Sequence, residues 1–351
     1  KNGLHIGSTD TVVSLCYRHL EYQVSNNDLK GKSIDRRECT IENQISGYDL
    51  GYLQAQQVTP IDIETHVKLL ISENKVGASS IGKVVDVLNA AYEWAIRQGD
   101  MQQNPVRLVK TELSKKLKKL SVKGADEADV VALSDEEIKL FEREATELHA
   151  NGHEKYPAGM YCLLLLHTGM RVGEMIALRW RDWKGDYLVI EKSVSTAKNR
   201  NKKSEDENNY ISLEGSTKNQ KARNIQLNRE AKYILWKLKH SRESCEQDDL
   251  IVPTKTGKMN TASNLEHRMK VIMKNAGLED VKGGLHIFRK TFATKMYENG
   301  ARVEEIAAYI GDLPSTTQKY YIAIRRKVVA GGETHQIVKL PGSKAGEEPV
   351  A

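Results

Sequence analysis

A lysine-rich stretch at residues 110–123 is the feature that most constrains the fold. It holds six lysines and, apart from leucines, few large apolar side chains that a core could bury. The chain has 351 residues, which is more than one compact core usually contains. We therefore predict two domains, with residues 111–130 as a basic linker between them.

The residues that precede this linker carry the signals of helices. Residues 12–20 place apolar side chains at helical spacing. Thr59 is a good capping residue, and Pro60 after it suits the first turn of a helix. We predict a small helical domain over residues 1–110, in which the polar residues 25–52 remain unassigned.

The residues that follow the linker predict a second domain over residues 131–330. Ser134 and Glu137 have the spacing of a capping box, which begins a helix. Two apolar segments predict further helices, the first of which ends at Gly169. Helical spacing then dominates from residue 229 onward.

The middle of this second domain predicts strands instead. Alternating apolar and polar side chains indicate three of them, at residues 187–195, 210–213 and 222–227. A very polar loop at 196–209 separates the first two, and residues 331–351 form a tail rich in glycine, proline and charges. The predicted fold class is mainly α with a small β-sheet.

Cysteine spacing and the lengths of the apolar runs exclude several classes of protein. The four cysteines include no Cys-x-x-Cys pair and lie near no paired histidines, which argues against a disulfide framework and against a zinc site. No apolar run approaches the roughly 20 residues of a membrane helix. We expect a cytoplasmic protein that has no membrane partner.

The basic residues are clustered. The net charge is +6, which alone is weak support for any partner. Two stretches, residues 110–123 and 198–223, are rich in lysine and arginine, and such clusters bind the phosphates of DNA by releasing counterions. A solvated face or a linker explains either stretch, taken singly, equally well.

Several side chains have the chemistry that a phosphodiester exchange needs. The attacked phosphate gains negative charge, which fixed arginines stabilise best, and the reaction also needs a nucleophile and a proton donor. Arg171 lies between glycines at a predicted helix junction, and His286 and Arg289 share one helix face at i,i+3 spacing. Lys218 is predicted in a turn between two strands, and a tyrosine pair follows near residue 320. Each of these has an ordinary structural explanation when it is taken alone.

Taken together and in order, these residues resemble the tyrosine recombinase (phage integrase) family, of the mobile-element integrase type. The resemblance covers nearly the whole chain and rests on three motifs: Thr168-Gly169-Met170-Arg171-Val172-Gly173-Glu174, then Thr217-Lys218-x4-Arg223-x-Ile225, then Leu285-His286-x-x-Arg289-x-Thr291. It implies a helical core-DNA-binding domain followed by an α+β catalytic domain.

The resemblance also implies roles. Arg171 and Arg289 would clamp the scissile phosphate, Lys218 would protonate the leaving 5′ hydroxyl, and His286 would assist proton transfer or orient the phosphate. A tyrosine would attack to give a 3′-phosphotyrosine bond, so no cofactor, no metal and no ATP are implied. Spacing from Asp312 selects Tyr321 as the nucleophile, whereas the preceding Thr-Thr-Gln pattern selects Tyr320.

One position departs from the family. The residue after the glycine of the last motif is usually His or Trp, but here Asp312 follows Gly311. An acidic group there would repel a phosphate, so its catalytic role is in doubt. The feature motivates one alternative, a catalytically inactive DNA-binding relative, and a type IB topoisomerase-like enzyme is another.

The resemblance further implies partners and a setting. We expect double-stranded DNA, a homotetramer on a synapse of two duplexes, and accessory DNA-bending or excision factors. The setting would be the nucleoid of a bacterial cell or of a phage-infected host. The chain begins with Lys1 rather than Met, so we expect that an upstream arm-binding domain was removed, which favours a mobile-element integrase.

Overall fold

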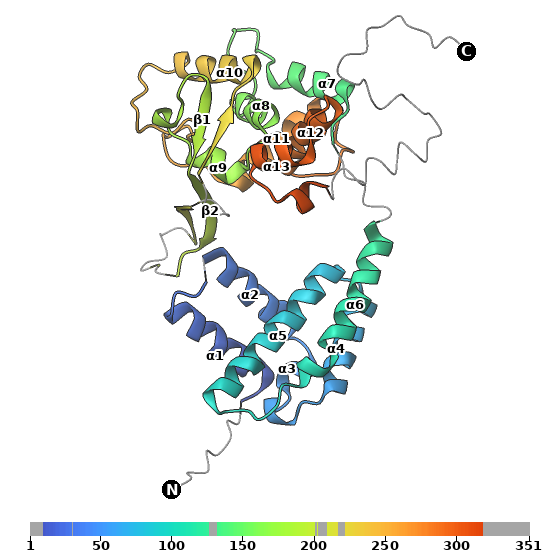
Figure 1. The fold of residues 1–351 in the computed structure, drawn as a ribbon. Helices are drawn as coiled ribbons and strands as arrows, with labels where there is room; N and C mark the ends of the chain where they lie inside the picture. Colours follow the sequence, from blue (N-terminus) through green and yellow to red (C-terminus); the bar gives the residue numbers. More distant parts are fainter. Residues whose placement is uncertain are drawn as a thin grey trace, which may run out of the picture. The chain divides into compact units, whose positions relative to one another are not determined.

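The computed structural model describes residues 10–29, 31–125, 132–200, 202, 209–216 and 222–318, without the side chains of residues 121–125 and 216. The chain forms two compact units. The first comprises Lys1–Asp129 together with Val194–Gly215, and the second comprises Val130–Ser193 together with Ser216–Ala351. Figure 1 shows the elements of each.

The first unit is a helical bundle around one apolar core. Its elements are α1 (Val12–Ser25), α2 (Gly31–Gln44), α3 (Asp49–Tyr52), the 3-10 turn η1 (Ala55–Gln57), α4 (Pro60–Glu73), α5 (Ala78–Gln98) and α6 (Pro105–Ala125). The predicted start of α4 is confirmed, because the Thr59 hydroxyl accepts from Asp62 N–H and the Asp62 carboxylate accepts from Thr59 N–H. The stretch 25–52, which the sequence left unassigned, contains α2 and α3.

The lysine-rich stretch is helical through residue 125, as part of α6. Four apolar side chains one or more turns apart enter the core of the first unit: Val106, Val109, Leu113 and Leu117. The lysines between them therefore stand on the other faces of a helix that packs on α4 and α5.

A hairpin from the middle of the sequence completes the first unit. Strands β2 (Lys192–Lys198) and β3 (Tyr210–Ser216) pair with each other, and most of the hairpin packs with the N-terminal helices. Arg200 forms ion pairs with Asp35 and Glu38 of α2, at 2.7 and 3.0 Å. Gly31 allows the close approach, since a Cβ there would lie 2.9 Å from Ala197 Cβ.

The second unit packs helices around one buried helix beside a two-stranded sheet. Its elements are α7 (Asp135–Ala145), α8 (Gly159–Thr168), α9 (Val172–Ala177), the 3-10 turn η2 (Trp180–Asp182), β1 (Tyr187–Ile190), β4 (Arg223–Gln226), α10 (Arg229–His240), α11 (Ala262–Asn275), α12 (His286–Glu298) and α13 (Val303–Ile310). Helix α8 lies among and contacts α7, α10, α11 and α12 (Figure 1). Nearly all of its side chains are buried. The predicted capping box of Ser134 and Glu137 is confirmed at the start of α7.

The strand predictions need two corrections. The expected strand 187–195 is interrupted at Glu191, so that β1 pairs with β4 and β2 pairs with β3. In β1 and β4 Leu188 lies opposite Ile225, and both are fully buried. Strand β2 also extends to residue 198, into the segment predicted as a loop. Within the described residues, β3 and β4 are not paired with each other, and the segment between them that carries Lys218 lies outside the described residues.

Two absences hold for the part of the chain that the structure describes. None of its helices combines the length and the apolar character needed to cross a bilayer. No group of three or more histidine, cysteine or acidic side chains there is arranged to hold a metal ion. The cysteines are unpaired, and Cys162 is buried in the core.

Candidate active site

The turn between α8 and α9 fixes the position of Arg171. Helix α8 ends at Gly169, whose φ of 61° lies in the left-handed region that glycine adopts most readily. A Cβ at this position would lie 2.4 Å from the Phe292 ring, so α12 also packs directly on the turn. Arg171 then caps the N-terminus of α9, two residues after the turn.

Arg171 is held by contacts from three directions. Its Nη1 donates to Glu174 Oε1 at 3.0 Å, and its backbone N–H donates to Glu174 Oε2 at 2.9 Å. Its Nη2 donates to the carbonyl of Gly311 at 2.8 Å and to Asp312 Oδ1 at 3.0 Å. These contacts fix the guanidinium in one orientation, although Asp312 lies 141 residues after Arg171 in the sequence.

Arg289 reaches the same place from α12. Its Nη1 donates to the carbonyls of Gly169 and Ile310 at 2.9 and 2.8 Å, and its Nη2 donates to Asp312 Oδ2 at 2.6 Å. Only 7% of the residue is exposed. Burial and the neighbouring charge of Arg171 lower the pKa of Arg289, but a guanidinium starts so high that it stays charged.

Asp312 joins the two arginines. One carboxylate oxygen accepts from Arg171 and the other accepts from Arg289. The structure thus brings together three residues that the sequence singled out, although they lie on three separate segments. Two guanidiniums that face one anion form a site suited to a phosphodiester.

Arg223 and Glu174 extend this cluster. Arg223 Nη1 and Nη2 donate to Glu174 Oε1 and Oε2 at 2.9 and 2.7 Å, and Arg223 Nε donates to the carbonyl of Tyr309 at 3.2 Å. Glu174 is 1% exposed. Burial raises its pKa, but the hydrogen bonds and charge of Arg223, followed by those of Arg171, outweigh that effect and hold the pKa below its ordinary value.

Sequence reasoning assigned no role to Arg223, although a signal was present. Side chains two residues apart on a strand share one face, and Ile225 and Leu227 are both buried. Arg223 is therefore predicted to point into the protein, where a charged side chain needs a partner. Glu174 is that partner.

His286 lies at the first position of α12, one turn before Arg289. Partial loss of hydration lowers its pKa, and the positive charges of Arg289, Arg171 and Lys290 lower it further, whereas Asp312 acts in the opposite direction. The imidazole is therefore neutral at neutral pH and can donate or accept one proton.

Three predicted site residues lie outside the described residues: Lys218, Tyr320 and Tyr321. In the sequence, described residues end shortly before Lys218 and shortly before the tyrosine pair. Strand β3 ends at residue 216, and residues 314–318 are helical just before the tyrosine pair. The candidate site within the described residues therefore consists of the arginines, His286 and the two carboxylates.

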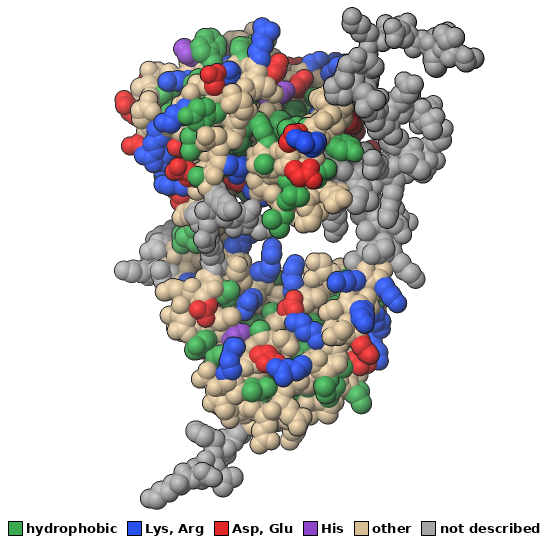
Figure 2. Space-filling model, viewed as in Figure 1, with side chains coloured by type: hydrophobic (Ala, Val, Ile, Leu, Met, Phe, Trp, Pro, Cys, Tyr) green, Lys and Arg blue, Asp and Glu red, His purple; other side chains and the backbone are tan. Residues whose placement is uncertain are grey.

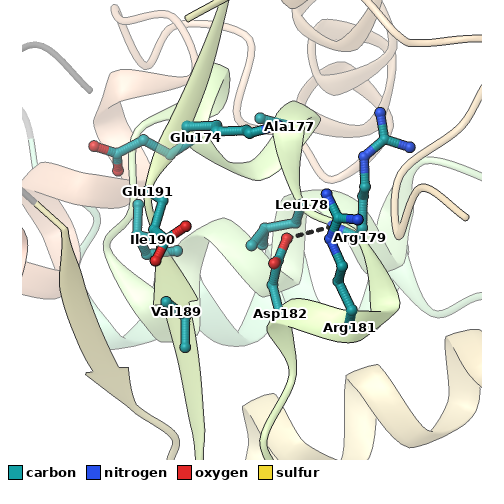
Figure 3. A pocket seen from close by; sticks show the side chains of 10 residues that line it. Glu174, Ala177, Leu178, Arg179, Arg181, Asp182, Val189, Ile190 and Glu191 are labelled. Carbon is teal, nitrogen blue, oxygen red and sulfur yellow. Dashed lines mark hydrogen bonds between the residues drawn. The ribbon is translucent and has the colours of Figure 1, made fainter. Parts of the chain in front are cut away.

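A polar pocket lies next to this cluster without being part of it. Figure 3 shows its lining, which includes Glu174, Arg179, Asp182 and Glu191. The Asp182 carboxylate accepts from the backbone N–H of Arg179 at 2.9 Å, as drawn there. Its charges are mixed in sign, and neither arginine that contacts Asp312 lines it.

Comparison with known proteins gives consistent results. Residues 133–326 match the phage integrase family, which is more than half of the chain. A tyrosine recombinase XerC-like protein from Caldanaerobacter subterraneus subsp. tengcongensis is 23% identical over 331 residues, covering 89% of this chain and 78% of that protein. Tyrosine recombinase XerD from Proteus mirabilis is 25% identical over 287 residues, covering 79% of each chain.

Solved structures show the same fold. The Tn1549 transposon integrase in complex with a circular intermediate DNA superposes with a TM-score of 0.68 at 15% identity, covering 91% of this chain and 99% of that one. A lambda integrase tetramer bound to a Holliday junction gives 0.62 at 18% identity, covering 88% and 78%. Together with the order of the motifs and the converging arginines, these matches show that the chain belongs to the phage integrase family, as a tyrosine recombinase of the integrase type.

Proposed function

We propose that this protein is a site-specific DNA recombinase that integrates or excises a mobile element through a 3′-phosphotyrosine intermediate. The observation that carries the proposal is the convergence of Arg171 and Arg289 on one anion position, occupied by the carboxylate of Asp312. Both guanidiniums are also tied to the protein on their other sides, so they are preorganised for charge that develops on a phosphate.

The reaction we propose has two balanced steps. In the first, the hydroxyl oxygen of Tyr321 or Tyr320 attacks the phosphorus and gives its proton to His286, the bond from phosphorus to the 5′ oxygen breaks, and Lys218 protonates that oxygen. In the second, a 5′ hydroxyl from a partner duplex attacks the same phosphorus and gives its proton back to Lys218, and the tyrosine leaves and recovers its proton from His286. The phosphodiester energy is kept in the tyrosyl ester, so the exchange consumes no ATP.

The remaining residues of the cluster have supporting roles in this proposal. Neutral His286 would accept a proton at the tyrosine or hydrogen-bond to the phosphate, since it can do either at neutral pH. Glu174 and Arg223 are positioning residues, because Glu174 contacts Arg171 and Arg223 in turn contacts Glu174.

Helix α6 supports a DNA-binding role for the first unit. Lysine and arginine side chains gather along this helix in Figure 2. A shallow hollow there is lined by basic and neutral polar side chains: Asn89, Arg107, Lys110, Thr111, Ser114, Lys115 and Lys118. Such a surface binds phosphates without reading base sequence, so it would hold the duplex while other contacts choose the site.

The assembly and setting follow from the relatives. The lambda integrase tetramer on a Holliday junction supports a homotetramer on two duplexes, and the Tn1549 integrase supports a mobile element as the substrate. Accessory DNA-bending or excision factors and a nucleoid location in the cytoplasm belong to the same proposal. We assign residues 1–110 to core DNA binding, 131–330 to catalysis and 331–351 to the tail. The linker expected at 111–130 overlaps α6, whose Leu113 and Leu117 belong to the core of the first unit.

A strand-exchange assay tests the function. Two labelled duplexes that carry the junctions of the element encoding the protein are incubated with the full chain, and recombinant duplexes are scored by length. We expect recombinant products and no requirement for ATP or a divalent metal. Relaxation of a supercoiled plasmid without any recombinant product would instead indicate a topoisomerase-like enzyme.

A further inference from the structure

Asp312 occupies one donor of each arginine in the cluster. Each of its carboxylate oxygens accepts from the Nη2 of one arginine. Its side chain is 23% exposed, so solvent reaches the trio at this residue as well as at Arg171, which is 18% exposed. An anion that binds these two donors must therefore displace the carboxylate.

The arginines do not need Asp312 to hold their positions. Arg171 is anchored by Glu174 and by the carbonyl of Gly311, and Arg289 is anchored by the carbonyls of Gly169 and Ile310. In these hydrogen bonds the acceptor is never Asp312, so they persist when its carboxylate is removed. Removing the Asp312 carboxylate would leave both guanidiniums fixed and two N–H donors without an anion.

A phosphodiester needs those same donors. Like a carboxylate, it presents two oxygens that share one negative charge, which is the arrangement that two guanidinium groups recognise. Among the described residues of the cluster, Arg171, Arg223 and Arg289 contribute three positive charges, while Glu174 and Asp312 contribute two negative ones. A neutral residue at position 312 would raise the net charge of this group from +1 to +2.

We propose that Asp312 competes with the scissile phosphate for Arg171 and Arg289, so that only DNA already held by contacts elsewhere displaces it. The inference rests on the proposed function of this site. The Asp312 backbone is fixed by a 2.9 Å hydrogen bond from its N–H to the carbonyl of Ala307, at the end of α13. Rotation of the side chain alone is therefore enough to release the donors. By this competition, Asp312 weakens the binding of DNA whose phosphate is not correctly placed at the two arginines.

Replacement of the carboxylate by an amide tests this competition. Single-turnover formation of the covalent adduct is measured on a nicked suicide duplex that spans the element junction, over a range of DNA concentrations. For Asp312→Asn we expect the half-saturating DNA concentration to fall roughly tenfold, because a like-charge contact is removed. Asp186→Asn is the matched control, since this exposed carboxylate pairs with Lys232 and loses the same charge.

The opposite pattern would overturn the inference. A maximal rate at least tenfold lower with an unchanged half-saturating concentration would mean that the chemistry needs the carboxylate. An equal tenfold gain in Asp186→Asn would attribute the effect to net charge. Asp312→Ser provides a second variant if the amide does not fold.

Inorganic sulfate separates this inference from the proposed function. Thermal melting of the full chain is followed as sulfate is added to wild type and to Asp312→Asn. We expect the variant to be stabilised at roughly tenfold lower sulfate, since its donors lack their own anion. If no protein forms a DNA adduct, the proposed function fails and the sulfate series still decides this point. Equal responses to sulfate would reject the competition.

Discussion

Arg223 donates from both of its terminal nitrogens to the carboxylate of Glu174, at 2.9 and 2.7 Å.. The pair joins strand β4 to helix α9, and its two residues lie 49 positions apart in the sequence. Glu174 also accepts from Arg171, so the orientation of the guanidinium that we propose binds the phosphate depends on strand β4. The cluster is thus a network in which each charge is positioned by another.

Removal of the Glu174 charge tests this network. We expect Glu174→Gln to lower the free energy of unfolding of the second unit by about 3 kcal/mol, because the buried carboxylate is the shared partner of two arginines. Urea denaturation followed by circular dichroism measures the change. Glu305→Gln is the control, since this exposed carboxylate pairs with Arg302 and its loss should change the free energy of unfolding far less. Equal losses in the two variants would contradict the network.

The same pair predicts a dependence of stability on pH. The pKa of Glu174 is lower in the folded protein than its ordinary value of 4.5. A carboxyl with a depressed pKa stabilises the fold above its unfolded pKa, and this contribution is lost as the pH falls through the folded pKa. The difference in unfolding free energy between wild type and Glu174→Gln should stay constant from about pH 7 to about pH 5 and shrink below 4.5. Urea series at each pH measure it, and a difference that grows in acid would reverse the sign we assign.

The arginines should affect chemistry far more than DNA affinity. We expect Arg171→Ala and Arg289→Ala each to slow cleavage by at least about a thousandfold, since each removes fixed positive charge from the transition state. DNA binding, measured by fluorescence anisotropy, should weaken by roughly tenfold at most, because we propose that basic surfaces outside the site also hold the duplex. Arg302→Ala is the control, as its side chain is 79% exposed and pairs with a neighbouring turn of its own helix. Cleavage at the wild-type rate in either active-site variant would disprove the assignment.

Gly169 should tolerate no side chain. Both Gly169 and Gly277 have positive φ, of 61° and 73°, so alanine at either position costs about 1 kcal/mol in backbone strain. Only at Gly169 would the added Cβ meet a neighbour, the Phe292 ring at 2.4 Å. We expect Gly169→Ala to lower the melting temperature more than Gly277→Ala and also to slow cleavage, because the turn aims Arg171. Equal melting temperatures would show that the ring moves aside at no cost.

Local signals predicted the helices well where a cap or a glycine marked their ends. The Ser134 capping box and the end of α8 at Gly169 are where the sequence placed them. Helix α2 was missed because Ile34 and Ile41 are nearly the only large apolar side chains in a polar sequence. The division of the first strand at Glu191 depends on pairing partners far along the chain, which local alternation cannot reveal.

The sequence predicted only part of the site, because local motifs do not reveal contacts between distant segments. Arg171, His286 and Arg289 were identified by motif, but motif spacing does not give the contacts between them. The bridge through Asp312 requires the end of α13 to meet both α12 and the turn before α9, which is a property of the tertiary fold. Arg223 was identifiable from strand alternation, yet its partner Glu174 was not, since opposite charges are plentiful in the sequence.

Covalent trapping tests the central claim most directly. Wild type, Tyr320→Phe and Tyr321→Phe are each incubated with a labelled suicide duplex that spans the element junction, and the products are separated on a denaturing gel. We predict an adduct in wild type that one of the two phenylalanine variants abolishes, with Tyr321→Phe expected to be that variant. An adduct that persists in both single variants, or none with a duplex that the protein demonstrably binds, would contradict phosphotyrosine chemistry by this pair.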